Sequence, residues 1–118
     1  MTQSDKESQG NHDRVTSEVK MAVLLRALRN AFAMSQAALA EQAGSSRPTL
    51  NRIETLAKQS VRSNTLDNLL QVFRDEGVEI TVGDTELNIR FTRKALMSAG
   101  SAIEESATPR NIGFSVSP

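Results

Sequence analysis

The segment SQAALAEQAGSSRPTLNRIE, residues 35–54, most constrains what this chain can fold into. An alanine-rich helical pattern begins after Ser35, stops at Gly44 and resumes after Ser46. Glycine readily adopts the left-handed backbone that ends a helix. Pro48 is tolerated in the next first turn, because N–H groups there have no intrahelical partner. The pattern therefore predicts two short helices joined by a tight turn that sets the second at a steep angle, so that it protrudes.

Helical apolar spacing continues on both sides of this pair of helices. TSEVKMAVLLRALRNAFAM predicts a first helix capped by Thr16 or Ser17, and another helix is expected from Ser63 or Asn64 to Gly77. The same spacing predicts inward-facing residues for these two helices and for the short helix that begins after Ser46. They are Met21, Leu24, Leu25, Leu28, Phe32, Leu50, Ile53, Leu66, Leu69, Leu70 and Phe73.

The apolar period changes to two after Gly77, with Gly83 and Asp84 between two alternating runs. This pattern predicts a β-hairpin, or an extended arm that pairs with a neighbouring subunit. Two strands alone are marginal in water, whereas pairing with a symmetry mate would give a four-stranded sheet. The residues predicted to form a shared dimer face are Val78, Ile80, Val82, Leu87, Ile89 and Phe91. A short helix is expected over residues 93–97.

Composition limits the chemistry open to the 118 residues. The chain has no cysteine, which excludes disulfides and thiolate metal sites, and its one histidine, His12, lies in a polar stretch. No run is long enough for a membrane helix. Residues 1–15 and 99–118 are poor in large apolar groups, so we expect mobile tails at both ends.

Charge is unevenly distributed along a chain whose formal net charge is zero. Residues 20–62 hold seven basic and two acidic residues, a net charge of +5, while the flanking parts carry −2 and −3. A solvated surface without a partner would instead intersperse the signs. The asymmetry favours a polyanion as the partner of the central region.

The residues LRALRNAFAMSQAALAEQAGSSRPTLNRIE, a polar link and TLDNLLQVF resemble the Cro/phage-repressor-type helix-turn-helix regulators, the XRE family, over roughly residues 20–76. The resemblance implies a mainly α, lambda-repressor-like bundle of four to five helices with a C-terminal β-hairpin or strand extension. It implies a DNA-binding domain over residues 16–77 and a dimerisation extension over 78–98. Arg29 and Glu54 match a structural ion pair of that family. Ser45, by contrast, stands where the family usually has a branched apolar residue.

The function implied is that of a sequence-specific double-stranded DNA-binding regulator, a dimeric repressor of a palindromic operator that controls its own gene. Arg47 and Arg52 can each offer a donor fork to guanine O6 and N7. Gln36 resembles the family's phosphate-anchoring glutamine. The residues expected to contact DNA are Gln36, Ser46, Arg47, Pro48, Thr49, Asn51, Arg52 and Lys58. We expect a cytoplasmic, nucleoid-associated protein.

Two other functions were weighed against this one. The segment LLQVFRDEGVEITV is similar to antitoxins of the HipB sort, which bind a toxin protein as well as an operator, and Ile112 and Phe114 could then dock on that partner. An enzyme is disfavoured because no nucleotide loop, metal-ligand spacing or cofactor motif is present. Glu79, Asp84 and Glu86 are close in sequence but are more simply solubilising groups on a hairpin.

Overall fold

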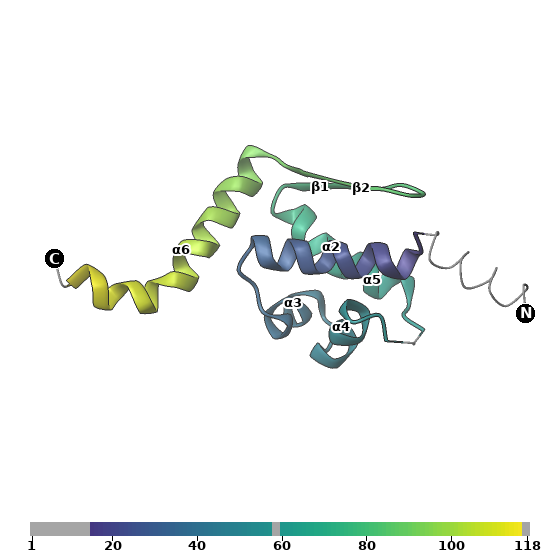
Figure 1. Cartoon of the computed structure of the whole chain (residues 1–118), viewed down its shortest axis with the longest axis horizontal. Helices are drawn as coiled ribbons and strands as arrows, with labels where there is room; N and C mark the ends of the chain where they lie inside the picture. The colour runs from purple at the N-terminus through teal and green to yellow at the C-terminus, as the bar shows by residue number, and fades with distance from the viewer. Residues whose placement is uncertain (1–14, 58–59, 117–118) are drawn as a thin grey trace, which may run out of the picture.

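The computed structural model describes residues 15–57 and 60–116, with side chains to Ala107. Figure 1 shows the hairpin above α2 and α5, with α3 and α4 below them and α6 to one side. The described part therefore confirms a mainly helical bundle with a β-hairpin. Its elements in chain order are α2 (Ser17–Ala31), α3 (Gln36–Ala43), α4 (Arg47–Glu54), α5 (Ser63–Asp75), β1 (Val78–Val82), β2 (Leu87–Phe91) and α6 (Arg93–Val116).

Side-chain caps define where the first three of these helices begin. The hydroxyl oxygens of Thr16, Ser35 and Ser46 each accept a hydrogen bond from the backbone N–H three residues later, at 3.1, 3.0 and 3.2 Å. Such caps satisfy donors that the helix itself leaves free, and each is worth about 1 kcal/mol. By contrast, α5 begins after Arg62 without a side-chain cap.

The core lies where α2, α3, α4 and α5 meet. Its largest fully buried side chains come from all four helices and are Phe73, Leu24, Leu25, Leu28, Leu39, Leu50 and Leu69. Phe32, at the end of α2, lies against Phe73 with ring centroids 5.5 Å apart. Apart from Leu39, these are positions at which apolar spacing predicted a buried stripe.

The hairpin is closed within the chain and packs on the chain's own core. Val78 pairs with Phe91, Ile80 with Ile89 and Val82 with Leu87, so all six apolar residues share one face. Val78 is buried, and Ile80, Leu87, Ile89 and Phe91 are half-buried against the core. Phe91 stacks on Phe32 at 6.0 Å. Lys20 Nζ also donates to the carbonyl oxygens of Gly83 and Asp84 at 2.7 and 3.1 Å.

The last helix is longer than the short helix expected over residues 93–97. Thr92 begins α6 by accepting from the N–H of Ala95 and by donating to the carbonyl oxygen of Gly77. Ala95 and Ala99 are buried one turn apart, and Lys94 Nζ donates to the carbonyl oxygen of Asp75 at 2.8 Å. Alanines give only a weak apolar signal in a sequence. The packing of Ala95 and Ala99, and the contact of α6 with the end of α5, were therefore not predicted.

Candidate nucleic-acid interface

The turn between α3 and α4 depends on one backbone conformation. Gly44 has φ +70° and ψ 30°, and no atom beyond its chain neighbours would lie within 4 Å of a Cβ built there. The N–H of Ser45 donates to the carbonyl oxygen of Ala40 at 2.8 Å, which closes the end of α3. Glycine is therefore needed here for its left-handed backbone rather than for space. The turn leaves only three residues between the end of α3 and the start of α4.

Apolar contacts hold α4 against the bundle on one side only. Leu50 is fully buried and Ile53 is nearly so, and α4 packs on both α2 and α3. Ala40 on α3 is also buried. The inner face of α4 is thus used for docking, which leaves its opposite face toward solvent.

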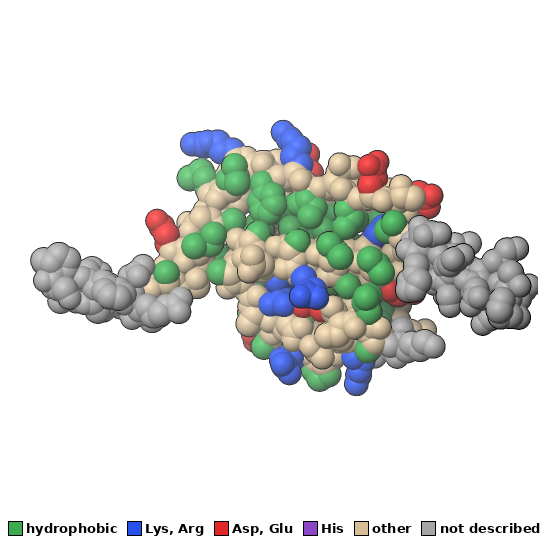
Figure 2. All heavy atoms as spheres, in the orientation of Figure 1, with side chains coloured by type: hydrophobic (Ala, Val, Ile, Leu, Met, Phe, Trp, Pro, Cys, Tyr) green, Lys and Arg blue, Asp and Glu red, His purple; other side chains and the backbone are tan. Residues whose placement is uncertain are grey.

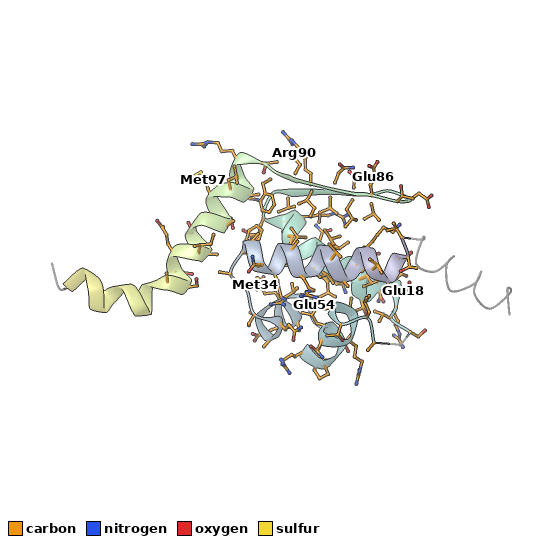
Figure 3. All side chains as sticks on the ribbon, viewed as in Figure 1. Glu18, Met34, Glu54, Glu86, Arg90 and Met97 are labelled. Carbon is orange, nitrogen blue, oxygen red and sulfur yellow. The ribbon has the colours of Figure 1, made fainter. Side chains whose placement is uncertain are left out.

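A buried ion pair holds the end of α4 to α2. Arg29 Nη2 lies 2.7 Å from Glu54 Oε1, and Arg29 Nε donates to Glu54 Oε2 at 2.8 Å. Arg29 Nη1 also donates to the carbonyl oxygen of Met34 at 3.0 Å. Glu54 is 3% exposed, and Figure 3 shows it between α2 and the α3–α4 pair. The two residues form the pair that the family resemblance implied.

The pair shifts the titration of both groups. Burial alone raises the pKa of Glu54, but hydrogen bonds from Arg29 and Gln36, with the positive charges of Arg29 and Arg26, outweigh it and lower that pKa overall. The hydrogen bond with Glu54 raises the pKa of Arg29. Both groups are therefore charged at neutral pH, which makes the contact a charge-assisted, bidentate one.

Gln36 links the start of α3 to the same cluster. Its Nε2 donates to Glu54 Oε1 at 3.0 Å and to Asn51 Oδ1 at 3.3 Å. Sequence reasoning assigned Gln36 to a phosphate and missed these bonds, although its place seven residues after Arg29 puts it near the same region. Because Asn51 is exposed on α4, Gln36 connects a buried carboxylate to the outer face of that helix.

The outer face of α4 carries the side chains expected to contact DNA. Arg47, Pro48, Asn51 and Arg52 are exposed. Within the part that the structure describes, neither Arg47 nor Arg52 has a hydrogen-bond or ion-pair partner. Figure 2 shows basic side chains protruding at the lower edge, below α3 and α4. Both guanidinium groups of α4 are therefore available to a ligand.

The two arginines lie on different flanks of α4. Five residues at 100° each separate them by about 140° around the helix axis. Arg52 lines an apolar hollow with Met21, Leu56 and Leu66, which places it on the side of α4 toward the starts of α2 and α5.

Ser46 and Thr49 bond to each other at 2.9 Å at the start of α4. Lys58 lies outside the described residues, as does the side chain of each tail residue proposed for a toxin, Ile112 and Phe114.

Comparison with known families identifies the family to which the chain belongs. A family model described as a helix-turn-helix domain matches residues 20–80, and the chain belongs to that family. The match spans α3, the glycine turn and α4, so this region is a helix-turn-helix DNA-binding domain. No curated protein and no solved structure matches the chain.

The described residues include neither a metal-ligand cluster nor a membrane-spanning helix. No cluster of three or more histidine, cysteine or acidic side chains suited to a metal occurs in that part of the chain. None of its helices is both long and apolar enough to cross a bilayer.

Proposed function

We propose that this chain is a sequence-specific double-stranded DNA-binding regulator that acts as a homodimer on a palindromic operator. It represses transcription there, including transcription of its own gene. The observation that carries the proposal is the two-sided character of α4. Its inner face is held by Leu50, Ile53 and the Arg29–Glu54 pair, while Arg47 and Arg52 are exposed and have no partner among the described residues. A helix presented in this way suits the major groove.

The roles of the side chains follow from their chemistry. Arg47 and Arg52 read guanine edges by two parallel hydrogen bonds each, and their separation around α4 directs them to different base pairs. Thr49 donates to phosphate or base edges, and Ser46 does so when its hydroxyl turns away from Thr49 Oγ1. Pro48 shapes the first turn. Asn51, positioned by Gln36, reads adenine or contacts a phosphate of the DNA backbone. Lys58, in the link after α4, contacts the DNA backbone.

A dimer is proposed because one helix-turn-helix reads too few base pairs, and paired half-sites one helical turn apart are the usual solution. Of the six hairpin residues expected to join the copies, five are at least half-buried in their own chain, and Val82 is 42% exposed. Most of the hairpin's apolar face is therefore covered by the chain's own core. The toxin-binding alternative stays a prediction.

Selection of bound sequences from random duplexes tests the proposal directly. We expect an enriched two-fold symmetric motif whose half-site centres lie about 10–10.5 base pairs apart. The purified chain should prefer that motif to a scrambled duplex by about 10³-fold or more. No enrichment at moderate ionic strength would overturn the proposal.

Matched arginine variants assign the contact surface. Arg47→Ala and Arg52→Ala should each weaken binding by about 10- to 100-fold for each half-site of the selected motif, the value of one bidentate base contact. Arg90→Ala removes the same charge from the hairpin, which lies on the side of the bundle away from α4 (Figure 3), and should change affinity less than about twofold. Equal effects of all three variants would point to general electrostatics.

A further inference from the structure

One face of α6 carries large apolar side chains that are more than half exposed. Leu96 is 61% exposed and Ile103 is 51% exposed, whereas Ala95 and Ala99 on another face are buried. Leu96 and Ile103 are seven residues apart, which places them on one side of the helix. Hydrophobic side chains are visible at the start of α6 in Figure 2. This exposed face is available to another molecule.

The spacing along this face is that of a helix-pairing seam. Leu96, Gly100, Ile103 and Ala107 follow one another at intervals of four, three and four residues, which is the alternation of core positions in a heptad. No charged residue lies in this row. A row without charge can meet an identical row, because a symmetric pair then places no like charges at its centre.

Gly100 gives independent support for a close neighbour. It lies inside α6 and does not have a positive φ. Apart from its chain neighbours and the nearby backbone of α6 itself, no described atom would lie within 4 Å of a Cβ added to it. The chain itself therefore needs neither its backbone freedom nor its lack of a side chain. Glycine within a helix costs about 1 kcal/mol relative to alanine. At the centre of an exposed apolar row, it lets the backbone of a second helix approach.

The direction of α6 suits a second copy of this chain. In Figure 1, α6 begins at the level of the hairpin and descends past α2 to the level of α3. A two-fold axis parallel to α6 would therefore keep both α4 helices on one side of the pair, as binding to one duplex requires. The apolar face of the hairpin offers less, because the chain's own core already covers most of it.

We propose that α6 pairs with α6 of a second copy, the two helices running in the same direction, through Leu96, Gly100, Ile103 and Ala107. This pairing rests on the homodimer of the proposed function and names the surface that forms it. The row from Leu96 to Ala107 is about 17 Å long, so the pair is short, and the dimer dissociates on dilution.

Single cysteines test the pairing cleanly, because the full chain contains none. Leu96→Cys and Ile103→Cys should each form disulfide-linked dimers under mild oxidation, since each residue meets its own copy in a same-direction pair. Ser101→Cys is the matched control, exposed on the same helix but outside the row. We expect several-fold more cross-linked dimer at positions 96 and 103 than at 101. Equal cross-linking at all three, or cross-linking only when Leu96→Cys and Ile103→Cys chains are mixed, overturns the proposal.

Light scattering over a concentration series supplies the second test. Ile103→Glu should raise the dimer dissociation constant at least tenfold, because an apolar contact is lost from both copies and two like charges meet. Ser101→Glu should leave that constant unchanged, and circular dichroism should show equal helix content in both variants. A dimer that survives Ile103→Glu and Leu96→Glu overturns the pairing of α6.

The same variants separate this proposal from the proposed function. An unaltered dimer of Ile103→Glu that still selects a two-fold symmetric motif overturns the α6 contact alone. Loss of cooperative binding to the full motif, with binding to a half-site retained, supports both. A wild-type dimer that cross-links at positions 96 and 103 but selects no sequence overturns the regulator and leaves the pairing of α6 standing.

Discussion

At the scale of residues, burial decides what an ion pair contributes. Arg29–Glu54 and Arg90–Glu79 both have an N–O distance of 2.7 Å. The side chains of the first pair are 23% and 3% exposed, and those of the second are 69% and 62% exposed. Water screens the second pair, and its long side chains lose entropy when they meet. Only the first pair is expected to control how α4 is held.

Replacement of the two arginines by methionine should separate these contributions. Arg29→Met leaves the carboxylate of Glu54 buried without its cation and should lower the free energy of unfolding by about 3–5 kcal/mol. Arg90→Met should lower it by less than about 1 kcal/mol. Urea unfolding at neutral pH measures both. Similar losses for the two variants would show that burial of Glu54 does not matter to stability.

The lowered pKa of Glu54 predicts how stability depends on pH. Because this pKa is lower in the folded chain than the unfolded value of about 4.3, the ion pair stabilises the fold above that pH. The contribution is lost as the pH falls through the folded pKa. Urea unfolding from pH 6 to pH 3 should therefore show a steeper loss in the wild type than in Glu54→Gln. Parallel curves for the two proteins would contradict this.

At the scale of elements, two glycines end helices for different reasons. Gly44 needs only its positive φ, because its surroundings are open. Gly77 has φ +98°, and an added Cβ would lie 2.7 Å from Thr92 Oγ1 and 3.0 Å from the backbone N of Ala95. It thus sits where α5, β1 and the start of α6 meet. The turn before α4 tolerates a side chain better than this junction does.

The two glycine positions give an ordered prediction. Gly44→Ala should lower the free energy of unfolding by about 1–2 kcal/mol, the cost of a left-handed backbone for an L-residue. Gly77→Ala should lower it more, because the same strain is joined by a clash with backbone. Thermal unfolding followed by circular dichroism ranks them, and Gly44→Asn should cost less than Gly44→Ala because asparagine tolerates this conformation. The reverse ranking at positions 44 and 77 would contradict the packing described around Gly77.

The helices and the hairpin differ in how much of them could be predicted from the sequence. Hydroxyl caps, Gly44 and the 3.6-residue spacing of leucines are local signals, so helix starts and core positions were predictable. The period of two at residues 78–91 showed which residues share a face, but no local signal says what covers that face. The bonds of Gln36 to Glu54 and Asn51 depend on the crossing of α3 and α4. The extent of α6 was missed because its buried face is built from alanines.

At the scale of the whole molecule, the charge distribution separates DNA binding from the rest of the surface. The net charge of +5 over residues 20–62 lies in the part of the chain that forms most of α2, all of α3 and α4, and the link to α5. The acidic flanks compensate it elsewhere. A protein of zero net charge can therefore still present a local field that attracts a polyanion.

The salt dependence of binding should reveal individual phosphate contacts. Lys58→Ala should reduce the magnitude of the slope of log K against log salt by about 0.9 for each bound copy, the value for one neutralised phosphate in duplex DNA. It should weaken specific and scrambled duplexes alike, because a phosphate contact carries no sequence information. Filter binding at several salt concentrations measures the slope, and Arg90→Ala should leave it unchanged. An unaltered slope for Lys58→Ala would remove this residue from the interface.

The most direct test of the central claim, that α4 reads bases with its arginines, is a scan of the selected motif. Affinity is measured for every single base-pair substitution, with the wild type and with Arg52→Ala. We predict that the wild type loses about 1–3 kcal/mol at one guanine of each half-site, and that Arg52→Ala loses discrimination at that position alone. A variant that binds every duplex more weakly by the same factor, with all base preferences intact, would contradict the account.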